Sequence, residues 1–464
     1  MRRFPLARLL LPPVLVNRAL LVIPALVAAS GCASHDLSNQ DPQSCAEGRT
    51  SVPLSVNRDL DLLFVIDDSG SMEDEQVSLA NNFHRFVDVL ENIEGGLPNI
   101  HIGVVSTDVG AGPYDIAGCD GSGDDGRLLA SAHGNCQPPG DAFISDIALA
   151  DGSRVRNYTG DLADTFACIA QLGSSGCGFE QPLEAMKRAL DGSNRENDGF
   201  LRDDATLMVV IISDEDDCSA ADTALFDPND ASLGAPSSFR CFEQGVACSP
   251  DAPRTPGAKS DCHPRDSSNL TASVQSYIDF LRGLKADPAM VAVADITGPR
   301  DPVDVVTGSG GELNLANACS SSSGVASPSV RLGAFLDGFP ARNTHTSICD
   351  DDLSDALILI AQTLTKTLGG PCIEGEIDRD PDTEGIQADC TLSQVQWPGT
   401  DQQVEQLIPA CDDSGTLPCW RLTVDDNNCY DTPTHAALDV ERGGETTTNS
   451  ILTLRCLDSC TLAP

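Results

Sequence analysis

The stretch that decides the fold is Phe-Val-Ile-Asp-Asp-Ser-Gly-Ser-Met, residues 64–72. It completes a mostly aliphatic run from Leu60 to Ile66, which has the length and composition of a strand buried on both faces of a sheet. Apolar side chains then recur at helical spacing over residues 73–94, at Val77, Ala80, Phe83, Phe86, Val87 and Leu90. The sequence therefore predicts a buried strand and an amphipathic helix, joined by a loop of acids and hydroxyls.

The same alternation continues across residues 58–368. Further strands are predicted at Ile100 to Ser106, Ala205 to Ser213 and Met290 to Ile296, and further helices at residues 160–172, residues 180–191, Leu270 to Leu284 and Leu353 to Leu368. Gly369, Gly370 and Pro371 then supply the residue types that end a helix, and they suggest a domain boundary. This order predicts an α/β fold with a doubly wound, mostly parallel sheet covered by helices on both faces.

Two segments interrupt this pattern and a third follows it. Residues 108–158 are rich in Gly, Asp and Ser, and residues 215–266 are rich in loop signals and cysteine. Both are predicted to be long surface insertions tied by disulfides. Residues 371–464 hold seven cysteines and short alternating apolar runs with little helical period, so we predict a small β-rich domain stapled by disulfides.

The amino terminus has the features of a lipoprotein signal peptide. Several arginines precede an apolar run from Ala19 to Ala29, and Ser30-Gly31-Cys32 follows it. We expect residues 1–31 to be cleaved, Cys32 to be lipidated, and residues 32–57 to form a flexible tether. Ala33 and Ser34 lack the aspartate of an inner-membrane retention signal, which favours the outer membrane. The alternative is an ordinary cleaved signal in which Cys32 has no special role.

Nineteen cysteines are too many for an ordinary cytosolic enzyme and indicate an oxidising compartment. Setting Cys32 aside leaves eighteen, an even number, as complete pairing requires. The candidate pairs that lie close in the sequence are Cys119 with Cys136, Cys168 with Cys177, Cys411 with Cys419, and Cys456 with Cys460. Spacing alone does not establish connectivity, and structural zinc, the rival interpretation, lacks paired CxxC ligands.

The strong negative charge of the chain argues against some classes of binding partner. The chain has 28 Lys+Arg against 70 Asp+Glu, a formal net charge of -42. Such a charge opposes binding to nucleic acid or to an anionic lipid surface. Abundant carboxylates suit hard divalent cations, although most surface acids only keep a protein soluble.

The loop that follows the first predicted strand carries the most informative chemistry. Asp67, Ser69 and Ser71 form an Asp-x-Ser-x-Ser motif at the carboxyl end of that strand. In an open α/β sheet, ligands bind in the crevice beyond the carboxyl ends of the strands. Hydroxyls and carboxylates, some acting through water, form an oxygen-only shell that suits Mg²⁺, Mn²⁺ or Ca²⁺.

At this motif the chain resembles the von Willebrand factor A family, whose metal-ion-dependent adhesion site opens with Asp-x-Ser-x-Ser. The resemblance covers about residues 58–368. It implies that the ion keeps one coordination position for an acidic residue of a protein partner. It also implies a further aspartate at the end of a later buried strand, a place that Asp214 fills after Ile211-Ile212-Ser213.

The middle loop departs from the family pattern. The resemblance implies a threonine just before a helix, but residues 173–180 read Gly-Ser-Ser-Gly-Cys-Gly-Phe-Glu. Ser174, Ser175 or Glu180 would then have to supply the oxygen. The acids after Asp214, namely Glu215, Asp216 and Asp217, are expected to contribute only at a distance from the ion.

Other readings have less support in the sequence. Asp378, Asp380 and Asp382 resemble a calcium loop, but Thr383 stands where the sharp turn needs glycine, so the sequence favours a solvated acidic turn. Hydrolase and phosphate-binding motifs are absent from the sequence, so we do not expect an enzyme. We expect a cell-envelope protein for adhesion or assembly that binds a divalent cation and an acidic partner. A metal-independent scaffold is the alternative, and an exported hydrolase is less favoured.

Overall fold

The computed structural model describes residues 59–456, with gaps at residues 93–95, 120, 133–135, 150–152, 287, 323, 341, 351, 369–372, 374–376, 378–384, 397–402, 413–414, 425–428, 430–433 and 442–449. The predicted signal peptide, the predicted lipidation site Cys32 and the predicted tether lie outside the described residues. So do Asp378, Asp380 and Asp382 of the calcium-like turn, and Cys460. The described residues contain no helix with the length and apolar character needed to cross a membrane.

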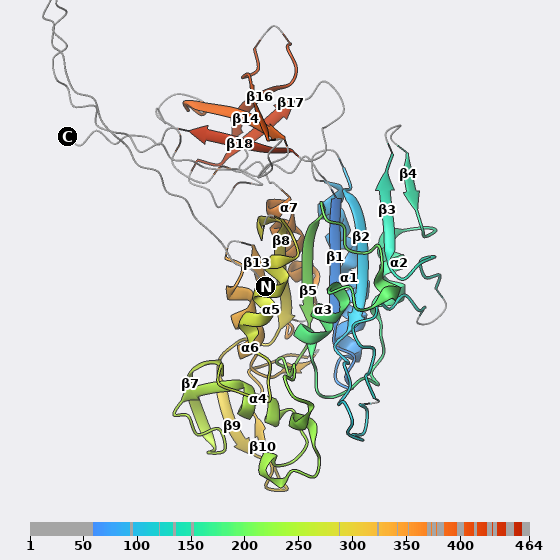
Figure 1. Ribbon diagram of the computed structural model, residues 1–464, viewed down its shortest axis with the longest axis vertical. Helices are drawn as coiled ribbons and strands as arrows, with labels where there is room; N and C mark the ends of the chain where they lie inside the picture. The colour runs from blue at the N-terminus through green and yellow to red at the C-terminus, as the bar shows by residue number, and fades with distance from the viewer. Residues whose placement is uncertain are drawn as a thin grey trace, which may run out of the picture. The chain divides into compact units, whose positions relative to one another are not determined.

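The central sheet is mostly parallel (Figure 1). Its strand order is β13-β8-β5-β1-β2-β3-β4, and the first five of these strands pair in parallel. The strands are β1 (Asp59–Ile66), β2 (Asn99–Ser106), β3 (Ile144–Ala148), β4 (Arg154–Arg156), β5 (Thr206–Ile212), β8 (Val291–Thr297) and β13 (Asn343–Ser347). The α/β prediction is confirmed at this level, because the buried apolar runs are the strands at the middle of the sheet.

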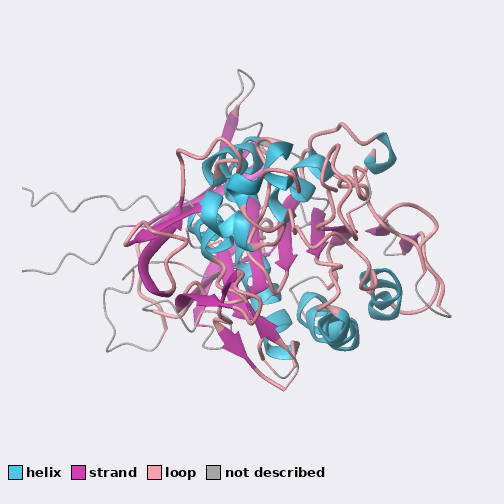
Figure 2. Cartoon of the chain, turned by 90° about the horizontal axis from the view of Figure 1, so that it is seen from below, coloured by secondary structure: helices cyan, strands magenta, loops and turns pink. Residues whose placement is uncertain are grey.

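Helices cover both faces of this sheet because the middle strands β8, β5, β1 and β2 are buried on both sides. One face packs against α1 (Glu73–Glu91), α2 (Leu162–Ala170) and α7 (Ser354–Thr367), and the other against α3 (Pro182–Leu190), α5 (Val274–Gly283) and α6 (Val330–Asp337). Phe64 points to the first face, where it meets Phe83 of α1 and Phe166 of α2. Figure 2 shows these helices and the strands among extensive loops.

Asp161 caps the amino-terminal end of helix α2. Asp161 accepts hydrogen bonds from the backbone N–H groups of Ala163 at 2.8 Å and Asp164 at 3.4 Å. We expect Asp161→Ala to lower the free energy of unfolding by about 1 kcal/mol, because two N–H groups lose their acceptor. Asp164→Ala, which removes an acid from the same turn but no cap, is the control, and urea unfolding of both variants measures the difference. Equal stability of the two variants would contradict a role for the cap.

The first insertion is not only a surface loop, and this part of the prediction was wrong. Residues 144–148 and 154–156 form β3 and β4, which extend the central sheet by antiparallel pairing with β2 and with each other. Asp146 of β3 is fully buried and binds Arg154 at 2.5 Å and Arg156 at 3.0 Å. The sequence did not predict these strands because they are polar. Ion pairs to the buried Asp146 stabilise them, and they have no long apolar run.

The second insertion also contributes regular structure. It contains the helix α4 (Phe239–Gly245) and the strands β6 (Val246–Ser249) and β7 (Gly257–Pro264). These two strands join β9 (Val303–Thr307) and β10 (Leu313–Leu315) in a four-stranded sheet (Figure 1). The short pair β11 (Cys319–Ser320) and β12 (Val325–Ala326) follows.

The carboxyl-terminal residues form strands, as predicted. A three-stranded antiparallel sheet has the order β15-β14-β18, and β16 pairs with β17. The strands are β14 (Cys390–Gln396), β15 (Val404–Ile408), β16 (Cys419–Val424), β17 (Ala436–Glu441) and β18 (Ser450–Cys456). Their inward-facing side chains form a separate core that includes Leu392, Trp420 and Leu454.

The disulfide pairing corrects three of the four sequence-local pairs. The structure joins Cys119 to Cys177 and Cys136 to Cys168, so both predicted pairs in this region are exchanged. Cys168 is fixed within α2, whereas the chain beyond this helix carries Cys177 to the loop after β1, where the Gly176 N–H donates to the Asp68 carbonyl at 2.8 Å. Neighbours in sequence are therefore separated in space.

Strand register accounts for the third correction. Cys456 pairs with Cys390, which lies directly opposite it in β14, and not with Cys460. The pair Cys411 with Cys419 agrees with the prediction. Where both cysteines are described, the structure adds Cys218–Cys241, Cys248–Cys262 and Cys319–Cys349, which the sequence did not predict. Disulfides on this scale fit a chain that folds in an oxidising compartment.

Candidate metal centre

Polar side chains occupy the carboxyl ends of four adjacent parallel strands. Asp67 follows β1, Thr107 follows β2, Ser213 follows β5, and Thr297 ends β8. The Asp67 N–H donates to the Ile212 carbonyl at 2.9 Å, and the Thr107 N–H donates to the Ile66 carbonyl at 3.2 Å. The hydrogen bonds between neighbouring strands therefore continue as far as Asp67 and Thr107. All four residues are fully buried. Because β1 lies between β2 and β5, this row is at the switch point of the sheet, where ligand crevices form.

Asp67 is held by both carboxylate oxygens. Its Oδ1 accepts from the Ser69 N–H at 2.8 Å and its Oδ2 from the Ser213 hydroxyl at 2.7 Å. Burial raises the pKa of Asp67, and the hydrogen bonds from Ser213 and Ser69 oppose that shift. The carboxylate is therefore fixed in orientation but lacks a neighbouring positive charge.

Ser69, Ser71 and Asp214 lie beside this carboxylate. The hydroxyls of Ser69 and Ser71 are 3.2 Å apart, and Ser71 also hydrogen-bonds the Asp214 side chain. Burial and then the nearby Asp67 raise the pKa of Asp214 to about 8. The structure thus brings together Asp67, Ser69, Ser71 and Asp214, the four residues that sequence reasoning selected first.

The middle loop contributes its glutamate and not its serine. Glu180 is buried, and the nearby charges that raise its pKa, after burial, are Glu215 and Asp67. It also hydrogen-bonds the Glu215 carboxyl group, an acid pair that requires a shared proton. Ser174 and Ser175 are exposed. Glu180 is therefore the oxygen donor that this loop offers.

Two further acids lie at the centre: Glu75, which sequence reasoning did not select, and Glu215, whose charge raises the pKa of Glu180 and of Asp214. Glu75 lies in the first turn of α1, is 5% exposed, and its charge raises the pKa of Asp214. A signal for it was present, because Glu75 precedes Leu79 and Phe83 at helical spacing and so falls on the buried face. Val77, which the pattern placed on that face, is 42% exposed.

Asp216 and Asp217 have roles outside the centre. Asp216 accepts from the backbone N–H groups of Arg331 and Leu332 at the start of α6. Asp217 binds the buried Arg331 guanidinium at 2.8 Å. Both acids are thereby satisfied by the fold itself, in contrast to Asp214.

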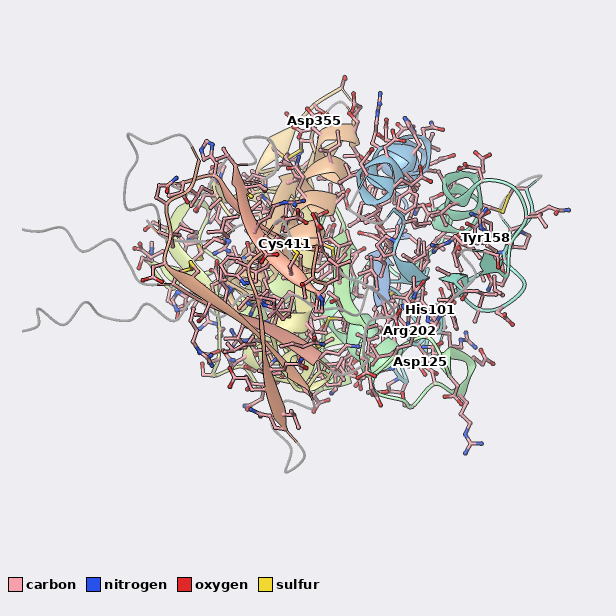
Figure 3. The ribbon with its side chains drawn as sticks, turned by 90° about the horizontal axis from the view of Figure 1, so that it is seen from above. His101, Asp125, Tyr158, Arg202, Asp355 and Cys411 are labelled. Atoms are coloured by element: carbon pink, nitrogen blue, oxygen red, sulfur yellow. A yellow bond between two sulfur atoms is a disulfide. The ribbon has the colours of Figure 1, made fainter. Side chains whose placement is uncertain are left out.

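The acids of the centre lack compensating cations. Among the described residues, no lysine or arginine forms an ion pair with Asp67, Asp68, Glu75, Glu180, Asp214 or Glu215. At the other end of β1, by contrast, the buried Asp61 has Arg202 Nε at 2.8 Å and Lys285 Nζ at 3.7 Å. Figure 3 shows Arg202 there beside His101. The buried acid within β1, Asp61, is therefore compensated by cations, whereas the buried acid just after β1, Asp67, forms no ion pair with a described residue.

Several buried oxygens of the centre also lack a hydrogen-bond partner. They are Asp68 Oδ1, Glu75 Oε2, Glu180 Oε2 and Asp214 Oδ1, and Thr107 Oγ1 after β2 joins them. Native structures leave few such atoms without a partner, and an ion is a recognised explanation for those that remain. Unpaired carboxylate and hydroxyl oxygens are the donors that a hard divalent cation takes, so the residues present fit such an ion.

Among the described residues, Cys411, Cys419 and Glu441 form the only group of three cysteine, histidine or acidic residues whose ligand atoms all lie within 4.8 Å of one another. Cys411 and Cys419 form a disulfide, so neither offers the thiolate that a metal needs, and Glu441 is paired with Arg421. The carboxylates around Asp67 do not converge as closely. An ion at this place would take the Ser69 and Ser71 hydroxyls, which are 3.2 Å apart, as direct ligands, and would reach the carboxylates partly through water.

Gln76 of α1 joins two loops of the centre. Its side-chain amide donates to the carbonyls of Asp67 at 2.8 Å and Gly173 at 2.9 Å and accepts from the Gly173 N–H at 3.0 Å. We expect Gln76→Leu to destabilise the chain by about 2 kcal/mol, because the buried Asp67 carbonyl and the part-buried backbone groups of Gly173 lose their partner. Asn81→Leu, at an exposed position of the same helix, is the control, and thermal unfolding is the measurement. Unchanged stability of the Gln76 variant would show that the hydrogen bonds of Gln76 to the two loops do not stabilise the fold.

Comparisons with known proteins identify no family for this chain. No family model and no curated protein matches it. Among solved structures, the conserved hypothetical protein BatB from Bacteroides thetaiotaomicron is 11% identical, with a TM-score of 0.25, over 66% of this chain and 98% of that protein.

Two pilus adhesins are similar at the same level. SpaC from Lactobacillus rhamnosus GG, in its open conformation, is 10% identical with a TM-score of 0.29 over 90% of this chain, and RrgA from Streptococcus pneumoniae is 10% identical with a TM-score of 0.27 over 86%. This chain spans 41% and 56% of their respective lengths. At these TM-scores the similarity carries no argument about function, so functional inference here depends on the geometry of the centre.

Proposed function

We propose that this chain is an exported, lipid-anchored protein that binds a divalent cation at the end of β1 and, through that ion, an acidic group of a protein partner. The fold proposed for residues 58–368 is of the von Willebrand factor A type. The observation that carries the proposal is the set of buried acids around Asp67, which have neither a cationic neighbour nor a full set of hydrogen bonds.

The roles of the residues follow from their contacts. Ser69 and Ser71 offer adjacent hydroxyl oxygens at the surface end of the centre, since Ser71 is exposed. Asp67, Asp214 and Glu180 provide negative charge from three separate loops, and Ser213 keeps the Asp67 carboxylate oriented. A divalent cation at this place supplies the missing positive charge and an open position for a carboxylate of the partner. The expected function is recognition in adhesion or envelope assembly, without turnover.

The experiment titrates the full mature chain with MgCl₂, MnCl₂ and CaCl₂ in a calorimeter and then repeats a pull-down of envelope proteins with and without chelator. We expect saturable binding of one ion and a partner that is lost in chelator. No heat from any of the three ions, together with a partner retained in chelator, would instead establish the metal-independent scaffold as the function.

A further inference from the structure

The loops of the candidate centre share a small apolar cluster with two disulfides. This cluster is separate from the cores on both faces of the central sheet. Its buried members are Ala111, Cys119, Cys177, Phe179, Cys218, Leu225, Phe226 and Cys241. Half of these residues are cysteines, joined as Cys119–Cys177 and Cys218–Cys241. A cluster this small depends on covalent bonds for much of its order.

The first bond fixes the loop that presents Glu180. Cys177 lies three residues before Glu180 in a segment between α2 and α3 that has no helix or strand. Through Cys119 that segment is joined to the first insertion, 58 residues away along the chain. The Gly176 N–H donates to the Asp68 carbonyl at 2.8 Å, so the bonded segment also lies against the loop after β1.

The second bond fixes the loop that presents Asp214 and Glu215. Cys218 lies three residues after Glu215, and Cys241 anchors it to α4 of the second insertion. The Cys218 N–H donates to the Glu180 carbonyl at 2.8 Å. The rings of Phe179 and Phe226 pack at 4.9 Å within the same cluster. Both disulfides therefore converge on Glu180, from opposite insertions.

We infer that Cys119–Cys177 and Cys218–Cys241 are positioning elements of the ion site, so that the oxidised chain binds a divalent cation tightly and the reduced chain does not. This inference rests on the proposed function. Each bond forms when two thiols give up two protons and two electrons to a disulfide oxidant, which is reduced to two thiols. All four cysteines are at most 5% exposed, so the finished bonds are shielded from attack by small thiols. The site would mature only outside the reducing cytoplasm.

The test compares three double variants of the full chain by calorimetric titration with CaCl₂ and MgCl₂. We expect Cys119→Ala/Cys177→Ala and Cys218→Ala/Cys241→Ala to bind the ion about 10- to 100-fold more weakly, as loss of outer-shell support does in other metal sites. Cys136→Ala/Cys168→Ala removes a disulfide outside the cluster and is the matched control, with unchanged affinity expected. Wild-type affinity in all three variants would overturn the inference.

A second measurement separates this inference from the proposed function. Amide hydrogen exchange of residues 173–181 and 213–219, recorded in chelator, reports the loops without any ion. Faster exchange in the two cluster variants but not in the control supports positioning, even if the wild-type chain binds no ion and the proposed function fails. Unchanged exchange overturns positioning. If an alanine pair does not fold, Cys119→Ala/Cys177→Val keeps the apolar volume and replaces it.

Discussion

Replacing Asp67 with asparagine is expected to weaken divalent-cation binding by about 100-fold or more, because even outer-shell partners of metal sites contribute 10- to 100-fold and this carboxylate lies at the centre of the acid group. The fold should survive the change. The asparagine Oδ1 can still accept from the Ser69 N–H, and its amide can donate to the Ser213 hydroxyl, which in turn can donate to the Glu215 carbonyl at 3.1 Å. Calorimetric titration with MgCl₂ and CaCl₂ measures the effect.

The unfolding temperature of the same variant shows whether weaker ion binding comes from loss of the fold. In chelator, Asp67→Asn should unfold at a temperature no lower than the wild type, because it removes a buried carboxylate that has no cationic neighbour. Asp88→Asn, an exposed acid on α1, is the matched control and should change neither affinity nor unfolding temperature. Ion binding by the Asp67 variant at wild-type strength would remove the basis of the proposed site.

The middle of the sheet was predictable from the sequence because burial on both faces leaves a continuous apolar run. The run Ala205 to Ser213 became β5, Thr206–Ile212, with ends shifted by one residue. Strands outside this environment lack such a run. β7, Gly257–Pro264, has almost no apolar side chains and exists through pairing with β6 and with β9, which lies far along the chain. Its conformation is set by tertiary pairing and not by local pattern.

The candidate centre was predictable where a motif and a strand end coincide. Asp67, Ser69, Ser71 and Asp214 each lie in a loop directly after a recognisable strand, and parallel strands bring such loops to one edge. Glu75 and Gln76 were missed because acids and amides in the first helical turn are ordinarily solvated, although spacing placed them with Leu79 and Phe83. The cysteine partners were not predictable, because they depend on how the insertions fold back over the sheet.

Without an ion, the chain should lose stability as the pH rises from about 4 to about 8. Burial raises the pKa of Asp214 and of Asp68 to about 8 each, with neighbouring acids adding to the shift. A carboxyl group whose pKa is raised on folding favours the protonated folded state. The stability that protonation of this group gives the folded chain is therefore complete below the unfolded pKa of 3.8. It declines as the pH rises, until the folded pKa is passed. For one such group the change is on the order of 5 kcal/mol, and because neighbouring acids influence each other the shifts do not add.

Thermal unfolding at pH 5 and pH 8, in chelator and in excess CaCl₂, tests this expectation. In chelator the unfolding temperature should be lower at pH 8, and Asp214→Asn should reduce that difference because it removes one titrating group. Calcium should restore more stability at pH 8 than at pH 5, since at pH 5 the ion must displace protons from its ligands. His345, whose pKa is raised by Asp295, shifts stability in the same direction in both ionic conditions, so it cancels from the calcium effect. An unfolding temperature independent of pH in chelator would mean that these acids are compensated after all, and the charge argument for an ion would fail with it.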